Sequence, residues 1–215
     1  ALQRLGRTED ASKAFDTALR LKPDGLQGWK NLANILFAFQ RMEGALFAYR
    51  QVLDLDPRDW DAACRTGYLH YRMGQLEEAL SYFSVCDSVR PNNAPTVYMR
   101  AALLRGLGRF EQAIAEGMRA HALDPGDADT CSDIGQALQG LHRHVEALPW
   151  FDRALGLQPA LEQALYHKAL SLAKLRRAGE AIAIHDQLKR TLRPDSTVTE
   201  LDLARLFADS APPSG

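Results

Sequence analysis

The sequence predicts an all-α fold in which helical hairpins stack one upon the next, and three periodic observations support this prediction. Prolines recur every 34 residues, at Pro23, Pro57, Pro91, Pro125 and Pro159. An alanine stands twelve residues before each of them, at Ala11, Ala45, Ala79, Ala113 and Ala147. A small residue stands twenty-four residues before four of them, at Ala33, Gly67, Ala101 and Gly135. Because one hairpin cannot bury its apolar face alone, each repeat is expected to pack against its neighbours.

The stretch from Leu26 to Pro57 shows the complete pattern of one repeat. Its apolar residues recur at helical spacing in two blocks, and a turn is expected between them near Gln40. The first block is Trp29, Leu32, Ala33 and Leu36, and the second is Ala45, Tyr49, Val52 and Leu53. Substituted copies of this pattern predict full repeats over about 26–59, 60–93, 94–127, 128–161 and 162–195.

Residues 1–209 are expected to form a single array with an incomplete repeat at each end. Residues 1–25 are a partial repeat, and residues 210–215 are expected to be a flexible tail. Thr197 and Glu200 form a capping box, which predicts a terminal helix over about 197–209. Apolar faces at the two ends predict a homo-oligomer, unless the terminal helix already acts as a polar cap.

The composition excludes several classes of protein. Hydrophobic residues make up 46% of the chain and charged residues 25%, which is ordinary for a soluble protein. The net charge of -1 gives no electrostatic signal for nucleic acid, and no apolar run is long enough for membrane insertion. The three cysteines lack paired spacing, so we expect free thiols in the cytoplasm. Because the first residue is Ala1, a longer protein with a targeting segment elsewhere is left open.

No set of residues predicts catalysis or a metal site. Gly106 and Gly108 follow a helix, so we interpret them as a turn and not as a phosphate-binding loop. His142 and His144 have no cysteine or carboxylate at ligand spacing, and Cys64 has no neighbouring base to activate it. We therefore expect no enzymatic activity, no metal and no cofactor within these residues.

One helix is expected to be weakly packed. Gly117 stands where other repeats carry a large ring, such as Tyr49 or Phe151. Glycine also costs about 1 kcal/mol relative to alanine in a helix interior. Residues 113–120 are therefore predicted to exchange their amide hydrogens readily, unless Met118 or a neighbouring side chain fills the space.

The repeated pattern, clearest from Trp29 to Pro57, resembles the tetratricopeptide repeat, and six copies share its phase. The resemblance implies a right-handed α-solenoid, a superhelix of antiparallel helix pairs. In that family the first helices line a concave groove that holds a peptide or another protein. The function implied is a protein-protein interaction scaffold.

A second hypothesis makes the array the substrate-binding or regulatory segment of a larger enzyme. Asn31 and Asn34 resemble the paired asparagines that line the repeats of O-linked N-acetylglucosamine transferases. The equivalent places in the next repeat hold Arg65 and Tyr68, so no asparagine ladder is expected. A third hypothesis, RNA binding by helical repeats, has no support from the overall charge.

The carboxylate clamp of chaperone-binding tetratricopeptide domains offers a further comparison. Lys30 and Asn34 match the first pair of that clamp. Arg65 replaces its next asparagine, and Pro95 and Met99 occupy its last two places. The incomplete match argues against recognition of a chaperone tail.

The partner is predicted to bind those residues of each repeat's first helix that do not belong to the apolar core. Arginine and tyrosine dominate the middle of this set, and both are enriched among interface hot spots. We expect an extended ligand with acidic and apolar side chains, with Asp129 and Asp133 preferring a basic residue further along. The predicted site is Lys30, Asn31, Asn34, Arg65, Tyr68, Tyr71, Arg72, Tyr98, Arg105, Asp129 and Asp133.

Overall fold

The computed structural model describes residues 25–191, which form ten helices and no strand. The chain divides into two compact units, Ala1–Thr96 and Val97–Gly215. The described helices that lie wholly in unit 1 are α2 (Leu26–Ala38), α3 (Met42–Leu55), α4 (Trp60–Arg72) and α5 (Leu76–Val89). The remainder are α6 (Ala94–Gly106), α7 (Phe110–Leu123), α8 (Ala128–Gly140), α9 (His144–Leu157), α10 (Glu162–Lys174) and α11 (Ala178–Thr191). The predicted partial first repeat, terminal helix and tail lie outside the described residues.

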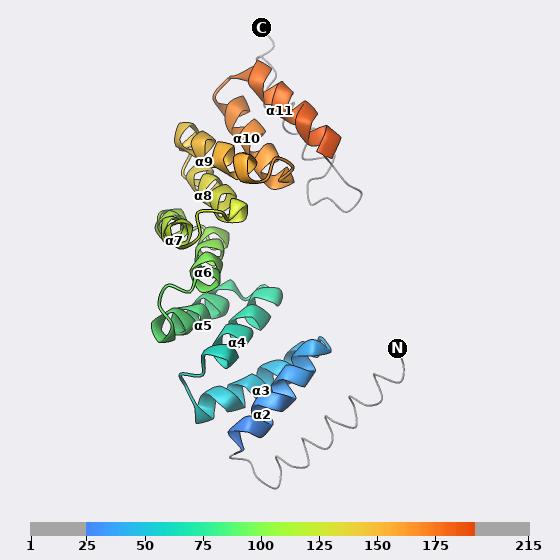
Figure 1. Ribbon diagram of the computed structural model, residues 1–215, viewed down its shortest axis with the longest axis vertical. Helices are drawn as coiled ribbons and strands as arrows, with labels where there is room; N and C mark the ends of the chain where they lie inside the picture. The colour runs from blue at the N-terminus through green and yellow to red at the C-terminus, as the bar shows by residue number, and fades with distance from the viewer. Residues whose placement is uncertain (1–24, 192–215) are drawn as a thin grey trace. The chain divides into compact units, whose positions relative to one another are not determined.

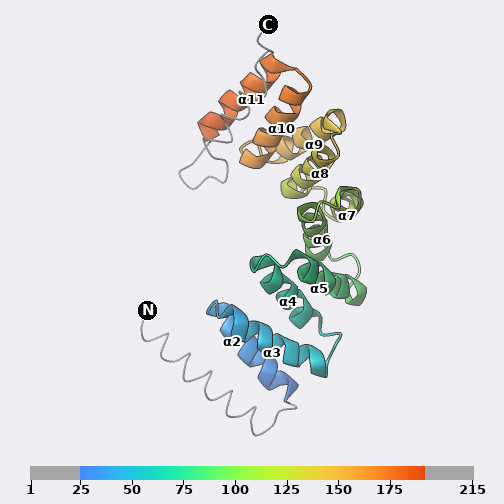
Figure 2. The ribbon, with the colours of Figure 1, turned by 180° about the vertical axis from the view of Figure 1, so that it is seen from behind.

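Consecutive helices pair as antiparallel hairpins, which confirms the predicted all-α repeat fold. In unit 1, α2 lies beside α3 and α4 lies beside α5, as Figure 1 shows. In unit 2, α8 lies beside α9 and α10 beside α11, and Figure 2 shows the same pairs from behind.

One turn geometry recurs in every described hairpin. The first helix ends at a residue with positive φ, and this residue recurs every 34 positions: Gln40, Gly74, Gly108, His142 and Arg176. In the first hairpin the N–H of Arg41 donates to the carbonyl of Leu36 at 2.9 Å, which closes a Schellman motif. The turn predicted near Gln40 is confirmed, as is the interpretation of Gly108 as a turn residue.

Asp59 and Asp127 mark the starts of α4 and α8. The side chain of Asp59 accepts a hydrogen bond from the N–H of Ala62, and the side chain of Asp127 accepts one from the N–H of Thr130. Such caps satisfy backbone donors that a first helical turn leaves without partners. Asp59 is buried and Asp127 is half-buried, so each cap also belongs to the packing between hairpins.

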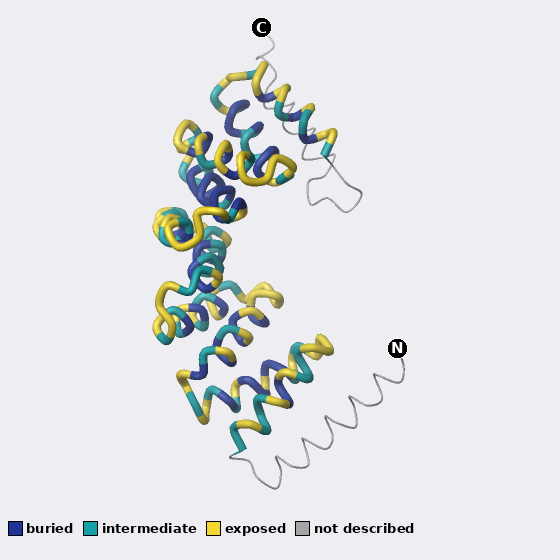
Figure 3. The backbone as a smooth tube through the Cα atoms, in the orientation of Figure 1, coloured by how far each residue is buried: buried dark blue, intermediate teal, exposed yellow. Residues whose placement is uncertain are grey.

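Small residues on the first helices receive large side chains from the second helices. A Cβ atom added to Gly135 would lie 2.6 Å from the ring of Phe151, so the ring packs directly on the glycine backbone. Figure 3 shows the result in α8, which is buried along most of its length. At Gly117, where the ring is missing, a Cβ would lie 2.7 Å from Ile134. Ile134 therefore fills the space beside Gly117. This is the exception that the prediction for residues 113–120 allowed, so no void weakens the packing at Gly117.

The cysteines differ from the prediction. Cys64 of α4 and Cys86 of α5 are joined by a disulfide, with their Cα atoms 6.0 Å apart, and only Cys131 is a free thiol. The expectation of three free thiols is therefore wrong for this pair. Its 22-residue separation matches no sequence motif, because the pairing of α4 with α5 in three dimensions brings the two cysteines together.

Reduction of this disulfide is expected to lower the free energy of unfolding by about 3 kcal/mol, because the link closes a 22-residue loop. Thiol titration of the unfolded, unreduced chain should find one reactive cysteine, and titration after reduction should find three. Urea unfolding with and without reductant measures the stability difference. Three reactive thiols in the absence of reductant would contradict the link.

Candidate functional site

The first candidate surface lies in unit 1, where α2 and α4 bring three rings together. The rings of Phe37 and Tyr68 are 5.9 Å apart between centroids, and those of Tyr68 and Tyr71 are 6.3 Å apart. Tyr68 is 37% exposed and Tyr71 is 44% exposed, whereas Phe37 is half-buried. We call these rings, together with Arg65 and Arg72, the arginine-aromatic cluster.

Both arginines of the cluster rest on ring faces. The guanidinium carbon of Arg65 lies 5.0 Å from the ring centroid of Phe37, and that of Arg72 lies 5.9 Å from the ring of Tyr68. Arg72 also donates a hydrogen bond to the Tyr68 hydroxyl at 3.2 Å. No carboxylate of the described residues forms an ion pair with Arg65 or Arg72. Two positive charges therefore stand on α4, held in place by rings but not neutralised.

The predicted polar residues of α2 are partly used within the fold. Lys30 forms an ion pair with Asp59, the residue that caps α4, so it positions the next hairpin. Asn34 accepts a hydrogen bond from the Tyr49 hydroxyl at 2.7 Å, while Asn31 is exposed and accepts one from Gln27.

Tyr49 is one of the polar groups that the core encloses. Burial raises its pKa to about 12, and the nearby Arg65 charge acts against that rise. The phenol therefore stays protonated at neutral pH and donates to Asn34.

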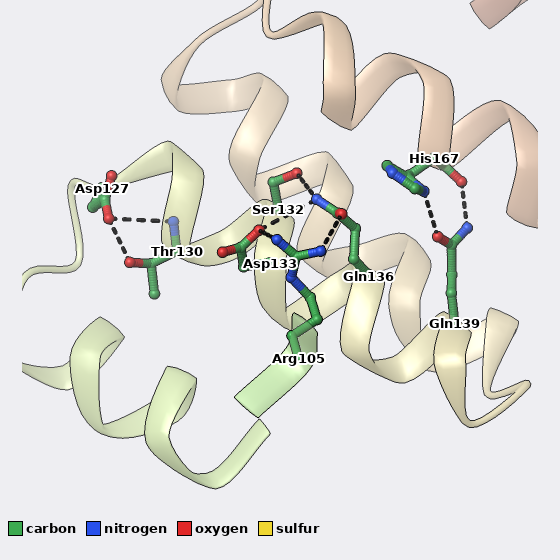
Figure 4. A network of polar contacts seen from close by, with 8 residues as sticks. All are labelled: Arg105, Asp127, Thr130, Ser132, Asp133, Gln136, Gln139 and His167. Atoms are coloured by element: carbon green, nitrogen blue, oxygen red, sulfur yellow. Dashed lines mark hydrogen bonds and ion pairs between the residues drawn. The ribbon is translucent and has the colours of Figure 1, made fainter. Parts of the chain in front are cut away.

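The second candidate site lies in unit 2. It is a network of polar side chains that bond to one another (Figure 4). Arg105 of α6 contacts Asp133 and Gln136 of α8, each at 3.1 Å. The Gln136 amide in turn donates to Ser132 at 3.2 Å. The predicted residues Arg105 and Asp133 are thus brought together, and each is the partner of the other.

Burial dominates the electrostatics of this network. It raises the pKa of Asp133 to about 6, although the Arg105 charge favours the ionised form. It also raises the pKa of Tyr98, a half-buried residue near Asp133. Asp129 is exposed, and partial burial together with Asp127 raises its pKa as well.

A neighbouring group of the same kind joins α8 to α10. Gln139 donates to the backbone carbonyl of His167 at 2.6 Å and to the Ser171 hydroxyl at 2.7 Å. The Nδ1 atom of His167 lies 2.8 Å from the Gln139 side-chain oxygen, and Figure 4 shows the pair. Burial lowers the pKa of His167 to about 4, and the Arg105 charge adds to this effect.

One contact recurs between successive first helices, and it joins residues 28 positions apart. In the three described cases its chemistry differs: a cation-π contact, an ion pair and a hydrogen bond. The pairs are Phe37 with Arg65, Arg105 with Asp133, and Gln139 with His167. Only the first pair leaves a full charge without a counter-charge.

The sequence analysis did not identify two buried residues that hold predicted or neighbouring polar side chains in place. Asp59 pairs with Lys30, and Ser171 accepts a hydrogen bond from Gln139. Asp59 could have been found, because an aspartate directly before a helix is a recognisable capping signal. Nothing in the sequence marks Ser171 as a partner of Gln139, because that contact depends on how α8 packs against α10.

The described residues offer no evident catalytic or metal-binding arrangement. Between residues 25 and 191 no three His, Cys, Asp or Glu side chains gather as metal ligands would. The sulfur of Cys131 lies 3.7 Å from Nδ1 of His121, but the thiol is buried and burial raises its pKa. This cysteine therefore lacks the thiolate character of a nucleophile.

Comparison with known proteins agrees with the fold. Residues 1–49 and 44–94 match the tetratricopeptide repeat family. The solved structure of YrrB, described as a tetratricopeptide protein with an unusual peptide-binding site, is 22% identical and has a TM-score of 0.74. That similarity covers 92% of this chain and 99% of YrrB. A MamA structure from Desulfovibrio magneticus RS-1 is 18% identical with a TM-score of 0.74, and the match covers 80% of this chain and 97% of that one.

A curated relative matches a smaller part. The 131 kDa subunit of transcription factor tau from Saccharomyces cerevisiae is 26% identical over 89 residues, which are 41% of this chain and 9% of that protein. The chain therefore corresponds to only a small part of that subunit's length.

Stacked antiparallel hairpins that share one turn geometry define an all-α helical-repeat protein. Residues 1–94 match the tetratricopeptide repeat family, and the described helices have the fold of solved tetratricopeptide proteins, so the chain contains tetratricopeptide repeats. The family indicates a protein-protein interaction scaffold, because tetratricopeptide proteins bind proteins or peptides. None of the helices between residues 25 and 191 combines the length and apolar character needed to cross a membrane.

Proposed function

We propose that the arginine-aromatic cluster of unit 1 binds an extended segment of a partner protein that carries acidic and apolar side chains. The observation that carries this proposal is the pair of un-neutralised arginines beside two exposed tyrosines. A guanidinium can hold a carboxylate through two parallel hydrogen bonds, and tyrosine adds contact area with little loss of conformational freedom. The peptide-binding site described for YrrB is a precedent in a protein of the same fold.

The predicted residues of unit 2 have a different role in this proposal. Arg105 and Asp133 neutralise each other, so neither offers a free charge to a ligand. Exposed Asp129 still suits a basic side chain, and half-buried Tyr98 offers an apolar surface. We therefore assign the acidic preference to Arg65 and Arg72 of unit 1. For unit 2 taken by itself, we propose that Asp129 favours a basic side chain.

The test uses peptides enriched from a random display library against the wild-type chain. The double variant Arg65→Glu, Tyr68→Ala is expected to bind these peptides at least tenfold more weakly, because it reverses one charge and removes one ring. The matched control is Arg50→Glu, Leu55→Ala, which changes an exposed arginine and an exposed apolar residue of α3 in the same way. Circular dichroism establishes that both variants are folded.

Equal affinity of the enriched peptides for the wild type and the cluster variant would place their site elsewhere. Equal losses in the cluster variant and the α3 control would show that general surface charge governs binding. Either result contradicts the proposal.

A further inference from the structure

The two un-neutralised arginines of α4 have a defined spacing. Arg65 and Arg72 are seven residues apart, so their Cα atoms are separated by about 10.5 Å along the helix axis. Tyr68 lies between them and within one helical turn of each. Its ring contacts Phe37, which supports Arg65, and its hydroxyl accepts a hydrogen bond from Arg72. The cluster is therefore two cation sites around one exposed ring.

An extended ligand can meet both cations only at particular spacings. In the polyproline II conformation residues i and i+3 point the same way and are about 9.3 Å apart. In a β-strand, residues on one face are about 6.7 Å apart at i+2 and about 13 Å apart at i+4. The first of these distances is the nearest to the Cα spacing of the two arginines along the helix.

We infer that the ligand of this cluster is a polyproline II segment with two acidic side chains three residues apart and an apolar residue between them. This inference rests on the proposed function and adds the spacing rule. The acidic side chains bind Arg65 and Arg72, and the intervening apolar residue, which points about 120° away from them, packs on the exposed ring of Tyr71. Both arginines are held over rings before the ligand arrives. Binding therefore loses less side-chain conformational entropy than it would with two mobile arginines.

Single-stranded nucleic acid is the main competing ligand for arginines beside aromatic rings. Stacking of successive bases requires several open ring faces, and here Arg65 covers Phe37 and Arg72 covers Tyr68, so Tyr71 is the one ring of the cluster without a cation over it. The net charge of -1 also provides no wider electrostatic attraction for a phosphate backbone. The structure therefore favours an acidic protein segment.

The comparison with Arg105 shows what makes these arginines available. At the equivalent contact in unit 2 the residue 28 positions from Arg105 is Asp133, which neutralises it. In unit 1 the residue 28 positions before Arg65 is Phe37, which supports the guanidinium without a counter-charge. A carboxylate placed at position 37 should therefore occupy Arg65 and compete with the ligand.

The experiment measures fluorescence anisotropy with a set of labelled peptides in a proline-rich host. Each peptide carries two glutamates at spacing i+1, i+2, i+3, i+4 or i+7 and a leucine beside the first glutamate. Matched peptides replace one glutamate by glutamine. The i+3 peptide is expected to bind at least fivefold more tightly than the i+2 and i+4 peptides, and to lose that advantage in either glutamine version.

Variants of the protein test the two cation sites. Arg72→Gln should remove the preference for i+3 spacing, because only one cation remains, whereas the exposed Arg50→Gln control should keep it. Phe37→Glu and Phe37→Gln both remove the ring and have nearly the same shape, so they differ mainly in charge. Phe37→Glu should bind the i+3 peptide at least tenfold more weakly than Phe37→Gln.

The outcomes separate the spacing rule from the proposed function. Acidic peptides that bind equally at all spacings, yet lose affinity with Arg65→Glu, Tyr68→Ala, would overturn the rule and leave the proposed function standing. A preference for i+7 would show that the two bound acidic side chains lie much further apart than one turn of polyproline II, and would overturn the rule as well. Tight, Arg65-dependent binding of a single-stranded oligonucleotide, with no binding of any acidic peptide, would overturn both.

Discussion

Replacement of Gly135 by alanine is expected to lower the free energy of unfolding by about 1–3 kcal/mol. The added methyl group would meet three ring atoms of Phe151 at 2.6, 2.7 and 2.9 Å, and both residues are held in the interior of their helices. Alanine favours the helix by about 1 kcal/mol over glycine, so the clash must exceed that gain. It does so here because the ring of Phe151 is fully buried and has little room to move.

Two other glycines provide matched controls. Gly67→Ala brings the methyl group 3.1 Å from Phe83, so a smaller loss or a neutral effect is expected. Gly156→Ala lies in α9 with nothing within 4 Å of the added atom, so it should stabilise by about 0.4–1 kcal/mol. Urea unfolding of the three variants measures this order. A Gly135→Ala variant as stable as Gly156→Ala would show that the ring yields to the methyl group.

The second large effect is on the pH dependence of stability. Asp133 and His167 change the free energy of unfolding in opposite directions as the pH rises. Burial raises the pKa of Asp133 to about 6 from about 3.9 in the unfolded chain, so the protonated carboxyl stabilises the fold. That contribution is complete below about pH 4 and is lost as the pH rises through about 6. Burial lowers the pKa of His167 to about 4 from about 6.5, so its contribution is present above pH 6.5 and is lost as the pH falls through about 4.

Each contribution amounts to about 3 kcal/mol, and the two act in opposite directions over nearly the same pH interval in the wild type. Asp133→Asn leaves the histidine effect, so stability relative to the wild type should rise between pH 4 and 6.5. His167→Asn keeps an amide donor near Gln139 but removes the titration, so relative stability should fall between pH 4 and 6. Urea midpoints at four pH values across this range measure both differences. Profiles parallel to that of the wild type would contradict this assignment.

The sequence alone determined the period of the repeat and the positions of its turns. The period of 34 residues, with small residues such as Ala33 and Gly135 at fixed places, predicted an all-α fold of helix pairs and the turn at Gln40. These features are local, because a helix end, a turn and an apolar face each depend on residues a few positions apart. Periodicity then places the same feature in every copy, which is why a residue with positive φ recurs every 34 positions from Gln40 to Arg176.

Only the tertiary structure decided which of the predicted partner-binding residues remain available. Asn31, Arg65, Asp133 and His167 occupy the same position of their repeats, yet Arg65 is exposed whereas burial shifts the pKa values of Asp133 and His167. For Arg65, Asp133 and His167 the difference comes from the residue that the preceding first helix places opposite them, which is Phe37, Arg105 and Gln139 respectively. A charge opposite a ring keeps its capacity for an external carboxylate, and a charge opposite its counter-charge does not.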